Sequence, residues 1–330
     1  MRKPAIGIYI PRWFCNTSEA NKIFARELVQ SIDSSSRYRA LLLNLPKLSF
    51  SDEDNLKKFV EEKKLTAILQ HDSPFFRTDS QYSSNIKRLG SLLPIFNSYR
   101  CQEVGHDKIS TKKLLRKLGL PVLDDKLISS LSDLENYTAK GGLYVVKPHN
   151  SGSGEGVKLF KKEKGMFWSY DNRKWHRIQI IEGVRKELKV KYKFHTRTPF
   201  LFLNNFTYSP MMLEPYFNDS FESFSSLRCT VVGDEVVEAV KRTNEKNITS
   251  NVSHGGRAEK IELSDEQKLA AIGAKNAVGA FYAGVDFLIR GKEWVIGEVN
   301  IGPISSFSKY TGVNVGKILG EHLMKEIHIS

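Results

Sequence analysis

The fold is decided by one stretch of sequence, Gly284-Val285-Asp286-Phe287-Leu288-Ile289-Arg290-Gly291-Lys292-Glu293-Trp294-Val295-Ile296-Gly297-Glu298-Val299-Asn300. Two apolar runs flank a short polar segment that contains a glycine, which is typical of two strands joined by a tight turn. Side chains alternate between the faces of a strand, so Glu298 and Asn300 lie on the same face. The stretch therefore predicts a β-hairpin with oxygen-bearing side chains on one face.

The length of the turn decides whether Asp286 joins those two side chains. A turn over Gly291–Glu293 pairs Arg290 with Trp294. Counting back from that pair, Asp286 lies opposite Glu298, with Cβ atoms about 4.5–5.5 Å apart. A two-residue turn shifts the pairing by one residue and puts Asp286 on the wrong face. The hairpin that brings the carboxylates together is thus the one with the three-residue turn.

Such a cluster of oxygen atoms points to a divalent cation. Two carboxylates at that spacing are costly unless a cation neutralises them. Carboxylate and amide oxygens suit Mg²⁺, which keeps several waters and binds nucleotide phosphates. The predicted metal ligands are Asp286, Glu298 and Asn300. A solvated acidic hairpin is the alternative, but residues 284–289 and 294–296 are too apolar for a fully exposed ribbon.

A glycine-rich loop after an apolar run predicts an anion-binding element. Lys147 ends a strand candidate and precedes Pro148, which keeps Lys147 extended. Closely spaced glycines let the backbone fold over an anion and point N–H groups at it. No GKS or GKT follows, so this is not a Walker motif. A flexible turn is the alternative, and the preceding lysine favours phosphate. The loop residues concerned are Ser151, Gly152, Ser153, Gly154 and Gly156.

Basic residues on neighbouring strand candidates form a third group. Arg228 lies in one apolar run, and Lys241 and Arg242 end the run that returns after a Gly-Asp turn. Such residues can converge on one negative charge, although each alone is more often a surface cation. A polar loop then brings Asn251 and His254. The histidine is a candidate general base, with a solvent-exposed loop histidine as the alternative.

The first 100 residues alternate strand candidates with amphipathic helices. Apolar runs occur at 5–10, 40–45, 65–69 and 95–96, and helix patterns occur at 18–32 and 52–64. Alternation of this kind indicates an α/β layer built around a parallel sheet. We therefore assign residues 1–100 to an N-terminal domain.

Residues 101–210 form a second predicted part. Residues 107–110 lead into a helix predicted over Thr111–Leu118, which Gly119 ends, and the glycine-rich loop follows later in this part. Residues 161–205 are rich in Lys, Arg and aromatic side chains and show little periodicity.

Residues 211–330 form the third predicted part and contain the hairpin. Apolar strand candidates precede a helix over 264–280, for which Ser264 is the N-cap and Gln267 completes a capping box. A last helix is expected over 313–327.

Composition excludes several classes of protein. The chain of 330 residues is 40% hydrophobic and 26% charged, an ordinary globular mixture. Lys and Arg number 50 against 37 Asp and Glu, and the formal net charge of +13 attracts anions. The three cysteines are far apart, which argues against a disulfide scaffold or a zinc cluster and fits a reducing cytoplasm. No apolar run is long enough to span a membrane. The basic start is followed by an apolar run that Pro11 and Arg12 break, so we interpret it as a first strand and not as a signal peptide.

Taken in order, these segments resemble the ATP-grasp superfamily. The resemblance is strongest to the branch of glutathione synthetase-like enzymes and of the ligase that adds glutamates to a ribosomal protein. It covers residues 100–330, and the series in this order is specific although each part alone is weak. Its parts are Asp107-Lys108, Val145-Val146-Lys147-Pro148 with the glycine loop, Leu213-Glu214-Pro215-Tyr216, Leu227-Arg228, Val240-Lys241-Arg242, Asn251, His254-Gly255-Gly256, Gly284-Val285-Asp286 and Glu298-Val299-Asn300.

The resemblance implies a fold of class α/β and α+β. An N-terminal parallel-sheet (pre-ATP-grasp) domain would precede two lobes that bind ATP between them. Lys108 and Lys147 would contact the nucleotide phosphates, with Lys241 also on the nucleotide side and loop 151–156 as a cover. The contacts to adenine, largely through backbone groups, would come from Glu214, Pro215 and Tyr216.

The same resemblance implies the catalytic roles. Two Mg²⁺ ions, or Mn²⁺ in their place, would be held by the three hairpin oxygens, with Glu298 bridging. Arg228 would steady the acyl phosphate and the tetrahedral intermediate, with Arg242 and Asn251 nearby. Pro215 departs from the pattern, because the relatives often carry an acidic residue there. The ribose contact would then come from Asp219 or Glu222.

The implied activity is ATP-dependent joining of a carboxylate to an amine. Attack of the carboxylate on the γ-phosphate gives an acyl phosphate, which the amine converts to an amide with release of phosphate. This route needs no protein nucleophile, in agreement with the lack of a convincing Ser-His-Asp or Cys-His arrangement in the sequence.

Two other functions stay open at this point. An ATP-grasp kinase would use the same ATP site but leave the phosphate on a small polyol or phosphate compound. A basic nucleic-acid-binding protein would use the net charge and the aromatic and basic residues of 167–194. We consider nucleic acid the weaker of the two.

The excess of Lys and Arg suggests an acidic partner. A small glutamyl compound, a peptide or an acidic carrier protein would each fit, and residues 161–205 are our hypothesis for what recognises it. No membrane partner is expected, and a homo-oligomer stays open.

Overall fold

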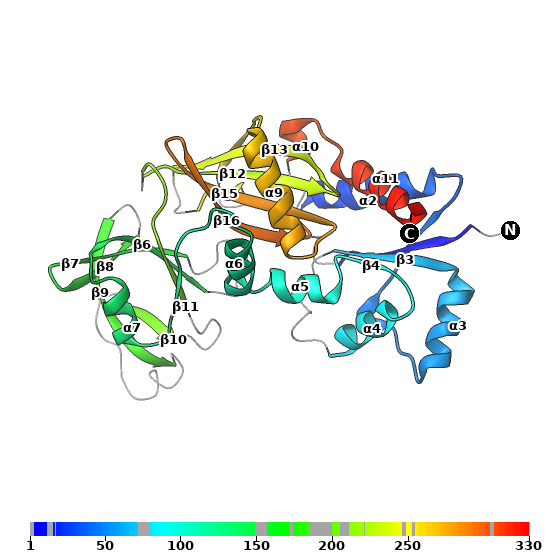
Figure 1. Ribbon diagram of the computed structural model, residues 1–330, viewed down its shortest axis with the longest axis horizontal. Helices are drawn as coiled ribbons and strands as arrows, with labels where there is room; N and C mark the ends of the chain where they lie inside the picture. The colour runs from blue at the N-terminus through cyan, green and yellow to red at the C-terminus, as the bar shows by residue number, and fades with distance from the viewer. Residues whose placement is uncertain are drawn as a thin grey trace.

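The computed structural model arranges the chain around three β-sheets (Figure 1). The central lobe, coloured green, projects from one side, whereas the N-terminal and C-terminal parts of the chain pack together. The structure describes residues 3–11, 16, 18–71, 80–148, 157–171, 174–184, 200–204, 211–220, 222–245, 249–252, 255–303 and 307–329.

The N-terminal sheet has four parallel strands in the order β2-β1-β3-β4, as the alternating pattern predicts. Side chains at the start of the helices cap them: Ser18 accepts a hydrogen bond from the backbone of Asn21, and Asp52 accepts one from that of Asn55. The elements are β1 (Ala5–Tyr9), α2 (Glu19–Asp33), β2 (Arg39–Leu42), η1 (Leu45–Lys47), α3 (Glu53–Lys63), β3 (Leu65–Gln70), α4 (Ser80–Gly90) and β4 (Ile95–Phe96).

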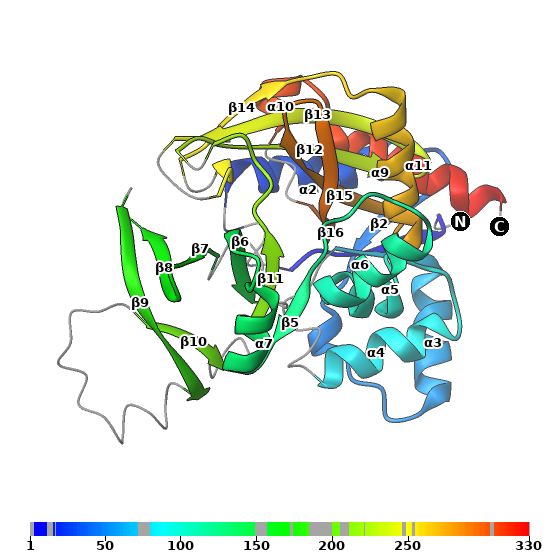
Figure 2. The same ribbon diagram turned by 60° about the vertical axis from the view of Figure 1, so that its left-hand side comes forward.

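The central sheet has seven strands in the order β10-β9-β8-β7-β6-β11-β5. Helix α7 lies against one face, where Phe160 and Leu134 join one apolar cluster (Figure 2). The described parts of 161–205, which showed little periodicity, are mostly strands of this sheet, and their predicted role in recognition stays a prediction. The elements are β5 (Lys126–Ile128), α7 (Leu131–Tyr137), β6 (Gly142–Pro148), β7 (Lys158–Glu163), β8 (Met166–Asp171), β9 (Lys174–Val184), β10 (Phe200–Asn204) and β11 (Met211–Pro215).

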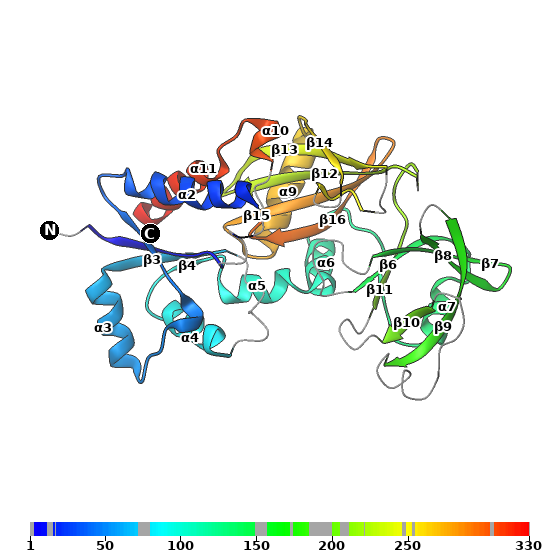
Figure 3. The same ribbon diagram turned by 180° about the vertical axis from the view of Figure 1, so that it is seen from behind.

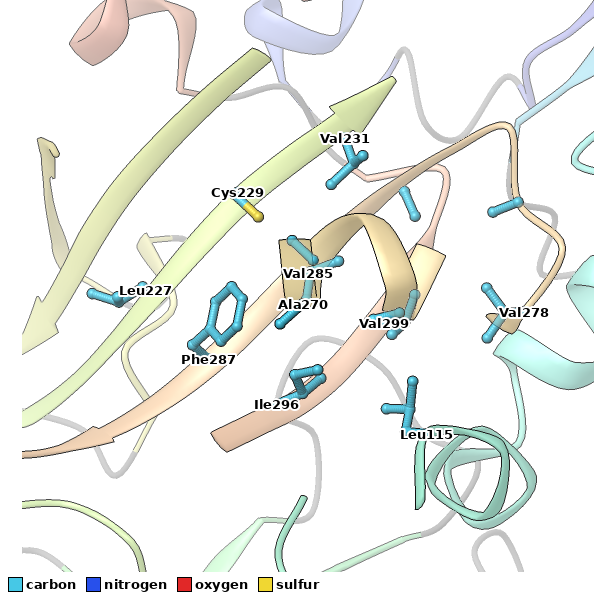
Figure 4. Packing of buried hydrophobic residues seen from close by; sticks show 14 of the residues in the cluster. Leu115, Leu227, Cys229, Val231, Ala270, Val278, Val285, Phe287, Ile296 and Val299 are labelled. Carbon is cyan, nitrogen blue, oxygen red and sulfur yellow. The ribbon is translucent and has the colours of Figure 1, made fainter. Parts of the chain in front are cut away.

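The C-terminal sheet has five antiparallel strands in the order β14-β13-β12-β15-β16. Helix α9 covers one face, where Ala270 packs near Val285 and Phe287 (Figure 4). The predicted capping box of Ser264 and Gln267 is confirmed at the start of α9. The elements are β12 (Phe224–Val232), β13 (Glu235–Asn244), β14 (Arg257–Lys260), α9 (Asp265–Ala277), β15 (Tyr282–Arg290), β16 (Glu293–Ile301), α10 (Ser308–Thr311) and α11 (Val315–Ile329).

Both predicted domain boundaries need correction. Strand β11 pairs with β5 and β6, so residues 211–215 belong to the central sheet and not to the C-terminal part. Helices α5 (Tyr99–Gly105) and α6 (Lys108–Lys117) pack on the C-terminal core through Cys101 and Leu115, although their residues fall almost entirely within 101–210. The boundaries moved because strand pairing and helix packing join segments that are distant in sequence.

The N-terminal sheet and the C-terminal lobe share one hydrophobic core. Helix α11 lies beside α2 (Figure 3), and Ile8, Leu28, Val232 and Leu319 belong to the same cluster. The side chain of Asn97 adds a polar link, because its Oδ1 accepts hydrogen bonds from the backbone N–H groups of Phe281 at 2.7 Å and of Tyr282, the first residue of β15, at 3.2 Å. These two parts therefore form one packed unit. None of the helices described in this chain is long and apolar enough to cross a membrane.

Candidate active site

The open face of the C-terminal sheet, opposite α9, carries the predicted polar side chains. Arg228 on β12 pairs with Asp286 on β15, and Asp286 pairs with Glu298 on β16. Directly paired residues share a face, so these three side chains form one row across the sheet. Asn300 pairs with Gly284 in the adjacent row. The three predicted metal ligands are thus brought together.

The turn of the hairpin differs from the expected one, although the carboxylates still meet. Arg290 pairs with Glu293 and not with Trp294, so the turn has two residues and the predicted three-residue turn is wrong. The register then shifts beside Asp286, where Gly297 is an extra residue in β16. Such a β-bulge places two residues opposite one. The extra residue brings Glu298 to the same face as Asp286, which a two-residue turn alone would not do.

Asp286 is neutralised by two arginines. Its Oδ1 accepts hydrogen bonds from Arg228 Nε at 2.8 Å and from Arg242 Nη2 at 2.6 Å, and its Oδ2 accepts one from Asn300 Nδ2 at 3.0 Å. Asp286 is only 8% exposed, so these side chains, and little water, surround its carboxylate. Arg242 also donates to Asn251 Oδ1 at 3.3 Å, which brings the predicted loop residue into the same network.

Helix α6 brings Lys108 to the second carboxylate. The Asp107 side chain accepts from the backbone of Ile109 and Ser110 and so fixes the first turn of the helix. Lys108 Nζ lies 3.3 Å from Glu298 Oε1. Burial disfavours ionisation of Glu298, but this lysine and its neighbours outweigh burial and lower the pKa of Glu298 below its ordinary value.

Glu214 at the end of β11 lies between two lysines. Its Oε1 accepts from Lys147 Nζ at 2.5 Å and its Oε2 from Lys112 Nζ at 2.6 Å. Burial opposes ionisation, yet the two ammonium groups outweigh it and lower the pKa of Glu214 to about 2. The same carboxylate raises the pKa of Lys147 against the opposing effect of burial. The carboxylate of Glu214 is therefore ionised at neutral pH.

One pocket between the central and C-terminal sheets joins these groups. Both apolar and charged side chains line it, the two kinds of surface that a nucleotide with a base and a triphosphate requires. The lining residues are Lys108, Val145, Lys147, Val157, Glu214, Pro215, Tyr216, Phe217, Asn218, Phe224, Ser225, Ser226, Arg242, Thr249, Ser250, Asn251, Asp286, Leu288, Gly297 and Glu298.

Not every predicted residue reaches this pocket. Lys241 pairs with Leu227, on the face that α9 covers, so it points away from Arg242 and the network of Asp286. The glycine-loop residues Ser151, Gly152, Ser153, Gly154 and Gly156 lie outside the described residues, as does His254.

The proposed carboxylate contact to ribose is not among the pocket groups. Asp219 accepts a hydrogen bond from the backbone N–H of Gly291 at 2.7 Å and so braces the turn of the hairpin. Neither Asp219 nor Glu222 lines the pocket, where Asn218 and Ser225 are the polar neighbours on that segment.

Two side chains of the site, those of Lys112 and Ser226, were not predicted from the sequence. Lys112 is one helical turn after Lys108, and that i, i+4 spacing on α6 was the signal that both lysines face the same way. Ser226 accepts hydrogen bonds from Arg242 Nε and Nη2 at 3.2 and 2.8 Å. Its position two residues before Arg228 places both on one face of β12.

The residues present fit a divalent cation and an anion. Two carboxylates and an amide oxygen on one face match the oxygen ligands of Mg²⁺, which commonly completes its shell with water and phosphate. Arg228 Nη1 is buried without a hydrogen-bond partner among the described residues, and a buried donor of that kind suits an incoming anion. The donor set therefore agrees with the predicted cofactors.

Comparison with known proteins agrees with this geometry. Residues 203–323 match the RimK-like ATP-grasp domain. The tetrahydromethanopterin:alpha-L-glutamate ligase of Methanocaldococcus jannaschii is 30% identical over 254 residues, which cover 77% of this chain and 76% of that protein. A probable alpha-L-glutamate ligase of Picosynechococcus sp. is 40% identical over 104 residues, 31% of this chain and 34% of that protein.

Solved structures share the fold over almost the whole chain. The ATP-grasp ligase PsnB, complexed with a phosphomimetic variant of its minimal precursor, Mg and ADP, has a TM-score of 0.63 at 15% identity and covers 98% of this chain and 99% of its own. D-alanine–D-alanine ligase from Bacillus anthracis has a TM-score of 0.59 at 13% identity, with 99% and 97% covered. The expected ATP-grasp fold is confirmed, and the chain belongs to the RimK-like ATP-grasp family of ATP-dependent carbon–nitrogen ligases.

Proposed function

We propose that the protein activates a carboxylate as an acyl phosphate and transfers the acyl group to an amine. The observation that carries this proposal is the row of Arg228, Asp286 and Glu298 on the open face of the C-terminal sheet, beside the pocket. It joins candidate metal ligands to a guanidinium whose buried Nη1 has no hydrogen-bond partner among the described residues. That combination serves a reaction in which negative charge passes from phosphate to a carbonyl oxygen.

Different residues of the protein act on the nucleotide and on the reacting carboxylate. All four of Lys108, Lys147, Glu214 and Tyr216 line the pocket. In this proposal the two lysines bind the triphosphate, and Glu214 and Tyr216 contact the adenine. Asp286, Glu298 and Asn300 would hold two Mg²⁺ ions, whose charge would offset that of the phosphoryl group. Mn²⁺ is the alternative ion. Arg228 then stabilises the oxyanion of the tetrahedral intermediate, with Arg242 and Asn251 fixing its surroundings.

The atoms balance without a protein nucleophile. A carboxylate oxygen forms a bond to the γ-phosphorus as the bond to ADP breaks. The amine nitrogen then bonds to the carbonyl carbon, phosphate leaves with the carboxylate oxygen, and the nitrogen gives up a proton. Positioning in a cleft that excludes water supplies much of the acceleration in reactions of this type.

We propose that one substrate is L-glutamate and that the other is a small molecule, a peptide or an acidic carrier protein. The names of the relatives support glutamate, and the complex of PsnB with a precursor peptide supports a peptide as the other substrate. The net charge of +13 supports an acidic acceptor.

The test is phosphate release from MgATP against a panel of amino acids, glutamyl compounds and acidic peptides, with masses of the products. The expected result is ADP, phosphate and a new amide in equal amounts. With ¹⁸O in the substrate carboxylate, one ¹⁸O atom should appear in the released phosphate. A phosphorylated product without free phosphate would support the kinase alternative, and phosphate without ¹⁸O would remove the acyl phosphate.

A further inference from the structure

A buried chain of alternating charges leads from the surface to the nucleotide pocket. Arg116 pairs with Asp125, Lys112 Nζ lies 3.9 Å from Asp125 Oδ1 and 2.6 Å from Glu214 Oε2, and Lys147 Nζ lies 2.5 Å from Glu214 Oε1. These ion pairs join α6 to β11 and β6, and therefore the C-terminal unit to the central sheet. Two lysines serve one carboxylate, and nothing in the ligase reaction itself requires the second.

The two lysines differ in where they lie. Lys147 and Glu214 line the pocket, whereas Lys112 lies behind Glu214, outside the lining, with a side chain only 3% exposed. Lys147 can therefore reach a ligand in the pocket, while Lys112 is committed to the protein. The arrangement gives Glu214 one movable cation and one fixed cation.

Nucleotide binding makes this difference matter. Under the proposed function Lys147 turns to the triphosphate, which competes with Glu214 for its ammonium group. Without another partner Glu214 would be a buried lone charge and would take up a proton. Lys112 keeps a cation on Oε2 throughout, so the carboxylate stays ionised after Lys147 has turned.

An ionised carboxylate is only a hydrogen-bond acceptor. It can accept from the 6-amino group of adenine, but it repels the 6-oxo group of hypoxanthine. A protonated carboxyl group could instead donate to the 6-oxo group, and the distinction between the two bases would weaken. The charge on Glu214 is therefore suited to choosing the nucleotide.

We propose that Lys112 is a positioning residue that sets base selectivity by keeping Glu214 an acceptor while Lys147 serves the phosphates. The proposal rests on the proposed function for ATP as the substrate and goes beyond it in assigning the choice of base to a residue outside the pocket wall. The charged and titratable groups around Glu214 are Lys112 from α6, Lys147 from β6, Asp125 next to β5 and Tyr137 from α7.

The experiment measures dissociation constants of MgATP and MgITP by calorimetry from pH 6 to 8.5, so no acceptor is needed. The variants are Lys112→Met, the conservative Lys112→Arg, and Lys113→Met as the matched control. Lys113 is the exposed next residue on α6, and its replacement makes the same change in charge. Comparison with Lys113→Met also corrects for the titration of the nucleotide, because that titration affects both variants equally.

For Lys112→Met we expect the preference for ATP over ITP to fall by at least about tenfold, in line with the loss of one correctly paired polar contact. The loss should be greatest at pH 6 and shrink as the pH rises, because without its fixed cation Glu214 becomes protonated at low pH and ionises again at high pH. Lys112→Arg should keep most of the preference, and Lys113→Met all of it.

A wild-type preference with a flat pH profile in Lys112→Met would overturn the proposal. Should that variant not fold, the double variant Lys112→Met/Glu214→Gln removes both charges of the pair and is compared with Glu214→Gln alone. The two should share one lowered, pH-independent preference, and a further change on adding Lys112→Met would contradict the proposal. Because MgATP binding is measured in the same experiment, an unchanged base preference in a variant that still binds MgATP would contradict this proposal but not the proposed function. A protein that binds neither nucleotide would remove both.

Discussion

At the scale of single residues, the clearance around Arg228 decides what its guanidinium can do. The group lies against the backbone of β15: a Cβ atom on Gly284 would be 2.2 Å from Arg228 Nη1 and 2.8 Å from Pro303 Cβ. Only glycine allows so close an approach. The Nη1 atom that lies there is buried and has no hydrogen-bond partner in the part of the chain that the structure describes, so Gly284 fixes the position of the proposed oxyanion contact.

We predict that Gly284→Ala lowers kcat by about 10²-fold, since a displacement near 1 Å at a reacting group has an effect of that size. The dissociation constant for MgATP should stay within a few fold, because Arg228 lies beyond the pocket lining. The two measurements are steady-state kinetics with the acceptor found in the panel and calorimetry. In an Arg228→Ala background the added methyl should matter little. An equal loss in both backgrounds would show that the methyl acts through Pro303.

The two carboxylates of the hairpin should respond differently to removal of charge. Glu298→Gln should lower turnover by about 10²–10³-fold with nearly unchanged thermal stability, since among the described residues only Lys108 forms an ion pair with it. Asp286→Asn should lose turnover and also about 3–5 kcal/mol of stability, because it leaves Arg228 and Arg242 buried without their carboxylate. Phosphate release and thermal unfolding test both. Equal stability of the two variants would contradict the assigned pairing.

At the scale of elements, helix α6 aligns two lysines with the site. Its first turn is held by Asp107, which accepts from two backbone N–H groups and from Ser110 Oγ at 2.8 Å. Lys108 follows directly and Lys112 is one turn later, so the cap sets the direction of both. The hairpin provides the second example, because the bulge at Gly297 and not the turn sets which face Glu298 occupies.

We predict that Asp107→Ala destabilises the protein by about 1 kcal/mol and weakens MgATP binding, because the frayed turn no longer holds Lys108 in place. Asp107→Asn retains the capping oxygen and is the matched control, with a smaller effect expected on both quantities. Thermal unfolding and calorimetry are the measurements. Weakened stability with unchanged ATP affinity would show that Lys108 does not depend on the cap.

At the scale of the molecule, the N-terminal sheet and the C-terminal lobe are joined into one unit. Helix α11 approaches α2 so closely that a Cβ atom on Gly316 would lie 2.5 Å from the carbonyl oxygen of Phe24. The shared core extends from Ile8 to Leu319. Lys112 on α6 pairs with Glu214 on β11, so the charged pairs of the site also connect the central lobe to that unit.

We predict that Gly316→Ala destabilises this unit by about 1–3 kcal/mol, the usual effect of overpacking. Gly273→Ala on α9 is the control, because its Cβ would make an ordinary contact 3.6 Å from Leu120 and should leave stability equal or slightly higher. Denaturant unfolding compares the two. If Gly316→Ala is as stable as the control, the close packing of α2 and α11 does not hold in solution.

The sequence alone determined the features that depend on neighbouring residues. Alternation placed Glu298 and Asn300 on one face, the strand and helix pattern predicted the parallel N-terminal sheet, and Ser264 marked the start of α9. These signals have a range of a few residues, since they follow from the period of a strand or from a cap. The site residues that such local patterns identified were largely brought together in the structure.

Only the tertiary structure decided what depends on distant pairs. The two-residue turn and its compensating bulge, the place of β11 in the central sheet and the contact of Lys112 with Glu214 have no local signature that fixes them. Each follows from packing one segment against another far along the chain, where burial and charge pairing choose the register and the partner. Periodicity gives the face of a side chain, and the fold gives the atom that it meets.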